Sequence, residues 1–257
     1  MDSFAALDVM ARLAREAGEA IMAVRRAGFA VERKSDRSPV TAADRLAETI
    51  ITEGLLQHFP GIPVVAEEAC EGCEPPAPTA RFWLVDPLDG TREFAAGRDE
   101  FCACIALVEE GFPVLGVLAE AARGLVHAGG PGLGAWTEDA GGTRRAIAAR
   151  LPPAEGLVVV DSVSHRDASA TDAFCRDLPV REVLRVGSAL KFARIAAGEA
   201  DVSPRLNGTM MEWDVAPGQA ILEGAGGTVL DPEGRRLRHG KPGYRQGGFV
   251  AWGRRQP

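Results

Sequence analysis

The segment 82–91 constrains this chain most, because an apolar run leads without a break into two carboxylates. Residues 82–85, Phe-Trp-Leu-Val, predict a short buried strand, and residues 86–91 read Asp-Pro-Leu-Asp-Gly-Thr. The proline fixes φ and favours a turn, and the glycine lets the backbone come close to a ligand. Asp86, Asp89 and the hydroxyl of Thr91 would then share one end of the strand. The competing interpretation is an ordinary β-turn with an Asx hydrogen bond and a threonine cap.

Two further acidic clusters adjoin predicted elements. Glu67-Glu68 follows an apolar stretch over 63–66, and Glu212-Trp213-Asp214 lies at the start of a helix predicted over 214–225. Strand ends in layered α/β proteins are where ligands usually bind. If the clusters converge, their repulsion and desolvation require divalent cations as the missing charge. Because Mg²⁺ prefers oxygen ligands and binds substrate phosphates, the sequence predicts a magnesium site that receives a phosphate.

The rest of the pattern predicts layers of helices and strands. Three- and four-residue apolar spacing predicts a helix ending near Gly28, with Phe4 on its buried stripe, and a second helix from Thr41, with Leu46 on its stripe. The later elements are a hairpin of strands 101–108 and 113–119, Gly-rich connections at 129–134 and 141–142, strands at 157–160, 183–186, 227–230 and 248–252, and helices at 168–178, 188–197 and 214–225. We expect one unit over 1–257, with subregions 1–150 and 151–257.

Composition excludes several classes of protein. The 29 Lys and Arg residues against 36 Asp and Glu give a net charge of −7 at pH 7, so no nucleic-acid partner is expected. Five scattered cysteines do not form a disulfide framework and fit a reduced, cytoplasmic location. No apolar run approaches the roughly 18 residues of a membrane span, and no export segment is visible.

The acidic motifs carry a family resemblance that spans nearly the whole chain. The pattern over 83–91, with Glu67-Glu68 before it and the Trp-Asp-Val-Ala-Pro-Gly segment 213–218 after it, resembles the inositol monophosphatase superfamily of magnesium-dependent, lithium-sensitive phosphatases. Segments 38–44, 92–94, 164–165, 187–192 and 212–214 are most similar to its 3′(2′),5′-bisphosphate nucleotidases, which convert adenosine 3′,5′-bisphosphate to AMP. The resemblance implies a five-layered αβαβα sandwich of the α/β class and allows a homodimer.

The resemblance also implies roles for individual residues. The implied ligands of two or three Mg²⁺ ions are Glu67, Asp86, the carbonyl of Leu88, Asp89 and Asp214. The implied catalytic residues are Asp44, Glu67 and Thr91, with Thr91 backed by Asp44 to orient the attacking water. The implied substrate-binding residues are Asp89, Gly90, Thr91, His165, Ser188, Lys191, Arg205 and Asp214. Lys191 and Arg205 suit a second phosphate, which inositol monophosphate lacks.

Simpler interpretations compete at several of these positions. Thr41 and Asp44 have the spacing of a capping box, and Asp214 has the position of a helix cap. His165, Lys191 and Arg205 have the alternative of being solvated surface residues. The acid Glu68 is left out of the metal set, the Glu199-Ala200-Asp201 segment is interpreted as a solvated helix end, and Cys70-x₂-Cys73 lacks the second pair of a zinc site.

Three departures from the nucleotidase pattern bear on the substrate. Cys102 and Cys104 stand where Thr and Asn are usual, and Ser203 replaces an aromatic residue that lines the nucleotide pocket in the family. The expected substrate is therefore a small phosphate ester, with adenosine 3′,5′-bisphosphate first and inositol or fructose phosphates as the alternative. A regulatory interaction protein on the same fold is the alternative from another class.

Overall fold

The computed structural model describes residues 1–34, 39–164, 167–206 and 210–254. Its α-helices are α1 (Ser3–Ala27), α2 (Ala42–His58), α3 (Thr91–Ala95), α4 (Ala168–Cys175), α5 (Leu190–Ala196) and α6 (Ala216–Gly224). Short 3₁₀ turns are η1 (Glu68–Cys70), η2 (Ala121–Arg123), η3 (Glu212–Asp214) and η4 (Pro242–Tyr244). None of the described helices combines the length and apolarity needed to cross a membrane.

The strands form two main sheets. The first has the order β3 (Val64–Ala66), β4 (Arg81–Asp89), β5 (Cys102–Glu109), β6 (Phe112–Glu120), β7 (Leu125–Gly130), β8 (Gly134–Glu138) and β9 (Arg144–Ile147). The second has the order β11 (Val180–Arg185), β10 (Leu157–Asp161), β12 (Val202–Arg205), β16 (Phe249–Trp252) and β14 (Thr228–Leu230). Two small pairs are β1 (Glu32–Arg33) with β2 (Pro39–Val40), and β13 (Met210–Met211) with β15 (Arg245–Gln246).

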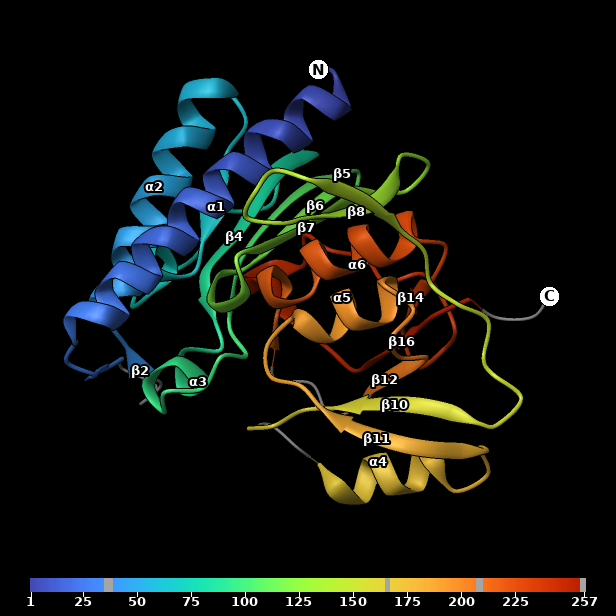
Figure 1. The fold of residues 1–257 in the computed structure, drawn as a ribbon. Helices are drawn as coiled ribbons and strands as arrows, with labels where there is room; N and C mark the ends of the chain where they lie inside the picture. The colour runs from blue at the N-terminus through green and yellow to red at the C-terminus, as the bar shows by residue number, and fades with distance from the viewer. Residues whose placement is uncertain (35–38, 165–166, 207–209, 255–257) are drawn as a thin grey trace.

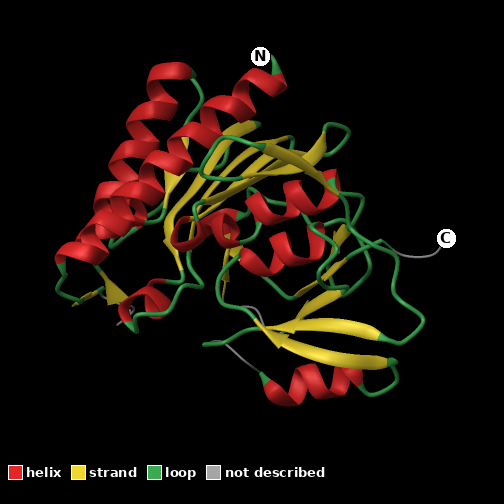
Figure 2. Ribbon diagram, viewed as in Figure 1, coloured by secondary structure: helices red, strands yellow, loops and turns green. Residues whose placement is uncertain are grey.

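The elements stack in five layers, as Figures 1 and 2 show. Helices α1 and α2 cover the outer face of the first sheet, and α5 and α6 lie between the two sheets. Helix α4 covers the outer face of the second sheet near β10 and β11 (Figure 1). The predicted αβαβα sandwich is confirmed.

The two N-terminal helices form where the apolar spacing predicts, but two stripe residues are wrong. Phe4 is 59% exposed and Leu46 is 45% exposed. Helix α2 instead buries its small face against α1, because a Cβ at Gly54 would lie 2.2 Å from Leu13 Cδ2. Leu46 lies outside the buried face of the helix, which includes Ala43, Ala47, Ile51 and Gly54, so spacing alone could not identify that face.

The Gly-rich connection predicted over 129–134 is only partly right. Residues 131–133 do connect two strands, and the connection predicted at 141–142 lies in a turn, but 129–130 belong to β7 and Gly134 begins β8. The hairpin of β5 and β6 is confirmed, but β7, β8 and β9 continue the sheet antiparallel to one another. At Gly130 the glycine allows two backbone segments to pack closely within the sheet, because a Cβ there would lie 2.2 Å from the Val114 carbonyl oxygen. Composition therefore indicated a loop where the sheet required a residue without a side chain.

The central strand of the second sheet, β12, was not predicted from the sequence. Asp201, just before this strand, is buried, so its interpretation as part of a solvated helix end is wrong. The Asp201 carboxylate accepts hydrogen bonds from the Val158 amide at 2.7 Å and from the Arg150 guanidinium at 2.9 and 3.0 Å.

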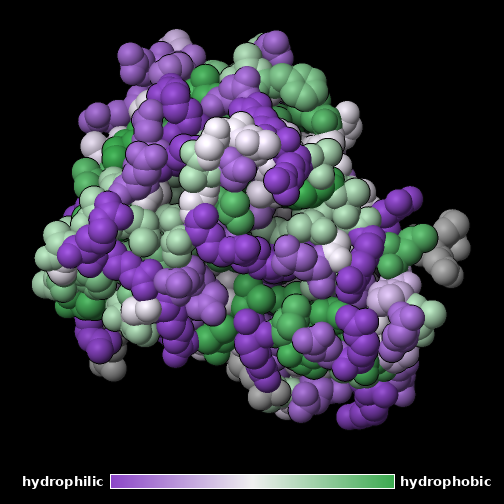
Figure 3. Space-filling view, viewed as in Figure 1, coloured by the Kyte–Doolittle hydropathy of each residue, from purple (hydrophilic) through white to green (hydrophobic). Residues whose placement is uncertain are grey.

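On the face seen in Figure 3, hydrophobic residues gather over β10 and β11, where Val183 is 44% exposed.

Candidate active site

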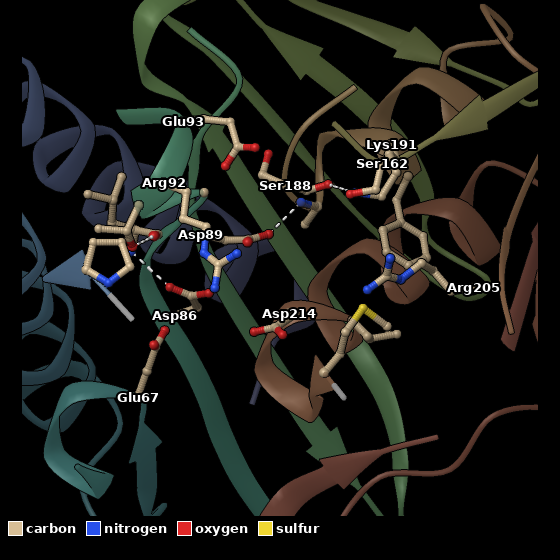
Figure 4. Close-up of a pocket in the computed structure, with 18 of the residues that line it drawn as sticks. Glu67, Asp86, Asp89, Arg92, Glu93, Ser162, Ser188, Lys191, Arg205 and Asp214 are labelled. Carbon is tan, nitrogen blue, oxygen red and sulfur yellow. Dashed lines mark hydrogen bonds between the residues drawn. The ribbon is translucent and has the colours of Figure 1, made fainter. Parts of the chain in front are cut away.

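A cavity of about 340 Å³ lies where β4 ends and α3, α5 and α6 begin. Its lining contains ten of the predicted site residues: Glu67, Asp86, Leu88, Asp89, Gly90, Thr91, Ser188, Lys191, Arg205 and Asp214. The close-up in Figure 4 shows carboxylates from both halves of the chain pointing into the same space. Asp44 lies behind Thr91, and His165 lies outside the described residues. Folding therefore brings together segments more than a hundred residues apart.

The end of β4 is both a turn and a carboxylate platform. Asp86 is buried, and its Oδ1 accepts the Leu88 amide hydrogen at 2.9 Å, which is the Asx bond of the simpler interpretation. Gly90 follows in the left-handed region with φ of 94°, and a Cβ there would lie 2.8 Å from the Glu100 carbonyl oxygen. The turn thus directs Asp86 and Asp89 into the cavity, and only glycine fits its corner.

Burial and neighbouring acids raise the pKa of two carboxylates in the cavity, Asp86 and Asp214. Burial raises the pKa of Asp86 well above its usual range, and the nearby Glu67, Asp89 and Asp214 raise it further. Burial also raises the pKa of Asp214, with Asp89 and Glu67 adding to the effect. An all-oxygen acidic donor set of this kind fits hard divalent cations, which would favour the charged form of each carboxylate.

Asp89 differs from its neighbours because cationic and amide groups face it. Burial raises its pKa to about 6, while Lys191 and the Ala189 amide oppose the increase. The Ala189 amide donates to Asp89 Oδ2 at 2.5 Å, a contact drawn in Figure 4. Asp89 therefore joins the acidic end of the cavity to the start of α5.

A lysine that sequence reasoning missed pairs with the Glu67 cluster. Lys34 Nζ lies 2.8 Å from Glu67 Oε1 and also forms an ion pair with Glu68. Burial opposes the charge on Lys34, but the two glutamates prevail and raise its pKa. Burial raises the pKa of Glu68 to about 7. Nothing in the sequence around Lys34 indicates this contact, which only the fold creates.

Asp44 serves as a helix cap and as a partner of Thr91. Its Oδ2 accepts hydrogen bonds from the amide and hydroxyl of Thr41 at 2.7 and 2.8 Å, which completes the predicted capping box. Its Oδ1 lies 3.1 Å from the Thr91 hydroxyl, which also lies 2.9 Å from the Leu88 carbonyl oxygen. Burial raises the pKa of Asp44. The cap and the contact with the cavity wall thus coexist in one carboxylate.

Asp214 does not cap the helix that follows it. Helix α6 has no side-chain cap, and Asp214 Oδ2 instead accepts the Met211 amide hydrogen at 3.0 Å within η3. The short η3 turn therefore fixes the carboxylate. This geometry leaves Asp214 directed at the cavity, as Figure 4 shows.

The other end of the cavity carries cationic and hydroxyl groups. Lys191 Nζ donates to the Ser188 carbonyl at 2.5 Å, and Ser188 itself has a positive φ of 54°. Burial lowers the pKa of both Lys191 and Arg205. In Figure 4 these two cations lie on the side of the cavity opposite Glu67, and Ser162 lies near Lys191. They are therefore cavity residues rather than solvated surface cations.

The aromatic surface of the cavity is not where the family pattern places it. Ser203 is buried in β12 and does not line the cavity. Phe192 and Phe249 do line it, and their rings stack with centroids 5.7 Å apart at an interplanar angle of 23°. Phe249 pairs with Arg205 across β12 and β16, a contact that required the sheet register.

Comparisons with known proteins agree with this geometry. A sequence model of the inositol monophosphatase family matches residues 5–254. The chain is 42% identical over 235 residues to the 3′(2′),5′-bisphosphate nucleotidase CysQ of Salmonella typhimurium, covering 90% of this chain and 92% of that one. It is 40% identical to the enzyme of the same name from Escherichia coli strain K12, with the same coverage.

Solved structures show the same fold. The crystal structure of CysQ from Bacteroides thetaiotaomicron has a TM-score of 0.81 and 26% identity, covering 98% of each chain. An inositol monophosphatase from Anabaena has a TM-score of 0.77 and 27% identity, covering 98% of this chain and 92% of that one. The predicted family, fold and phosphatase class are confirmed by these similarities.

Proposed function

The chain belongs to the inositol monophosphatase family, and we propose that it is a Mg²⁺-dependent phosphatase that removes the 3′-phosphate of adenosine 3′,5′-bisphosphate to give AMP. The observation that carries this proposal is the division of one cavity into an acidic end and a cationic end. At the acidic end, bound cations would contact one phosphate of the substrate. At the cationic end, protein side chains would bind a second phosphate directly. The substrate in the names of the similar enzymes has both phosphates.

The acidic end has the donors that two or three Mg²⁺ ions need. The residues that would hold them are Glu67, Asp86, Asp89, Asp214 and, through its carbonyl, Leu88. The raised pKa values of Asp86 and Asp214 among these acids support this assignment. Divalent cations bound there supply positive charge for the phosphate oxygens and lower the pKa of water. Asp89 and Asp214 would also face the substrate.

Thr91 and Asp44 would handle the proton of the attacking water. The Thr91 hydroxyl can donate to Asp44 while its oxygen accepts a hydrogen from water, so a proton can pass toward Asp44. Burial raises the pKa of Asp44, which makes its carboxylate a better proton acceptor. The Gly90 amide at the start of α3 would help to orient the phosphate.

The cationic end would select for the second phosphate. Lys191 and Arg205 would bind it, with Ser188 beside them, and His165 belongs to the same group on the family pattern alone. Phe192 and Phe249 supply an apolar wall near Arg205. An inositol monophosphate has no second phosphate to offer these two half-buried cations, which disfavours it as the substrate.

A phosphate-release panel tests the proposal. It compares adenosine 3′,5′-bisphosphate with inositol 1-phosphate and fructose 1,6-bisphosphate, with and without Mg²⁺ and Li⁺. We expect the nucleotide to be hydrolysed fastest, only with Mg²⁺, and less in Li⁺. A preference for inositol phosphate would overturn the substrate and leave the metal site standing. Failure on every ester, with a copurifying partner, would favour the regulatory protein.

Three organisational proposals accompany the activity. All five cysteines are free thiols, which supports a cytoplasmic location. Residues 1–257 would act as one unit, with subregions that meet near 150. A homodimer is proposed from the family resemblance, and sedimentation velocity of the purified chain would test it.

A further inference from the structure

Two thiols lie against the wall of the cavity, on the strand beside β4. Cys102 and Cys104 alternate along β5, so both side chains point to the same face of the sheet, and both are fully buried. Their sulfur atoms are 3.7 Å apart. In the sheet register Cys102 pairs with Asp89 and Cys104 pairs with Asp86. The proposed function uses neither thiol.

A carboxylate completes a set of three donors with these thiols. One oxygen of Asp89 and both sulfur atoms lie within 4.8 Å of one another. Zinc–sulfur bonds of about 2.3 Å in a tetrahedral site place two sulfur ligands about 3.8 Å apart. The observed sulfur separation of 3.7 Å therefore fits two corners of such a site without rearrangement of β5. Thiolates prefer soft or borderline cations such as Zn²⁺ and Cd²⁺ over Mg²⁺.

The surroundings suit both the charge and the coordination number. Two thiolates and one carboxylate around a divalent cation carry a net charge of −1. Lys191 balances this charge, because both Asp89 and Cys102 act on it electrostatically. Ser188 lines the cavity, and its hydroxyl accepts a hydrogen bond from Cys102 Sγ at 3.6 Å, so this oxygen would be the neutral fourth donor.

We propose that Asp89, Cys102 and Cys104 form a binding site for a thiophilic divalent cation such as Zn²⁺, which shares only Asp89 with the Mg²⁺ sites. Binding releases the two thiol protons to solvent and leaves every sulfur in its reduced state. Because Asp89 belongs to both donor sets, a cation bound to the thiols draws this carboxylate away from the acidic end. Zn²⁺ therefore inhibits the enzyme in competition with Mg²⁺.

The test is a cadmium titration of the full chain with all thiols reduced by a phosphine. Cd²⁺ bound to thiolates gives an ultraviolet sulfur-to-metal charge-transfer band, which requires no substrate and no activity. The reference protein carries Cys70→Ser and Cys73→Ser. Cys70 is half-buried and Cys73 is exposed, so this pair of thiols could otherwise bind Cd²⁺ as well. The test protein carries Cys102→Ser and Cys104→Ser in the same background, and a third protein restores Cys102 alone.

We expect the reference protein to bind one Cd²⁺ with a band from two thiolates. The double variant loses the band, and the protein with Cys102 alone binds at least tenfold more weakly. Excess Zn²⁺ displaces the Cd²⁺, whereas excess Mg²⁺ weakens binding only through Asp89. The proposal is overturned if the band is absent from the reference protein, or if the double variant keeps it. Neither result bears on whether the chain hydrolyses a nucleotide.

A second measurement addresses inhibition. In phosphate release, the Zn²⁺ concentration for half-inhibition should rise at least tenfold in the double variant, with Mg²⁺ held constant. Equal inhibition of the two proteins would overturn the competition through Asp89. Circular dichroism of both proteins shows whether the serines leave the fold intact, and Ala at both positions repeats the comparison if they do not.

Discussion

The two ends of the cavity use opposite charges in different ways. The acidic end holds Asp86 and Asp214 beside Glu67 and Asp89, and burial together with these neighbouring acids raises the pKa of Asp86 and of Asp214. These two carboxylates are therefore suited to cations from outside the chain. At the cationic end Lys191 already has a partner in the Ser188 carbonyl, and burial lowers its pKa. The difference indicates that one end of the cavity is arranged to bind cations from solution and the other end to bind an anion directly.

The sharpest way to break this comparison is to remove one buried carboxylate. Asp86→Asn should reduce kcat/KM by at least about 1,000-fold on every phosphate ester, because bound cations supply several kcal/mol of charge stabilisation. Phosphate release at saturating Mg²⁺ measures the loss. Turnover near that of the wild type would remove Asp86 from the metal ligands.

The second change separates a proton acceptor from a helix cap. Asp44→Asn should lower kcat about 100-fold and leave KM nearly unchanged, because an amide cannot take the proton that passes through Thr91. The matched control is Thr41→Ala, which removes the cap and costs about 1 kcal/mol of stability with little loss of kcat. Equal losses of kcat in both variants would show that Asp44 acts only through the cap.

The third change sharpens the comparison at the cationic end. Lys191→Gln and Arg205→Gln should each raise KM for the bisphosphate about 10- to 100-fold, because a charge-assisted hydrogen bond contributes roughly 1.5–3 kcal/mol. Hydrolysis of a monophosphate should change far less. If both substrates suffer alike, the two cations support the fold rather than the second phosphate.

The smallest effect concerns stability without metal. Asp86→Asn should raise the metal-free free energy of unfolding by about 1–2 kcal/mol at neutral pH, because the asparagine removes repulsion among the carboxylates. The folded pKa of Asp86 lies above the ordinary 3.8, so the wild type carries this penalty only as pH rises above that value.

Denaturant unfolding in a chelator measures this difference across the pH range. The difference in the free energy of unfolding between the variant and the wild type should vanish near pH 3.8 and increase toward neutral pH. It should change sign when Mg²⁺ is added. A gap that stays constant with pH would mean that Asp86 is not held against other charges.

The sequence predicted the carboxylates at the acidic end of the cavity better than the strand and the ion pairs that hold the surrounding structure in place. Asp86, Asp89 and Gly90 are neighbours in one turn, so their spacing alone placed them together. Strand β12 and the buried Asp201 were missed, because four residues with a proline give no clear periodic signal. Lys34 was missed because its partners lie more than thirty residues away.

By itself, the sequence determined the two N-terminal helices, the β5–β6 hairpin and the carboxylates at the end of β4, because each depends on contacts a few residues apart. Only the tertiary structure decided that Asp214 and Lys191 share a cavity with that turn, and that Cys102 stands opposite Asp89. Those meetings depend on strand register and on the packing of α5 and α6 between two sheets, and local spacing carries no information about either.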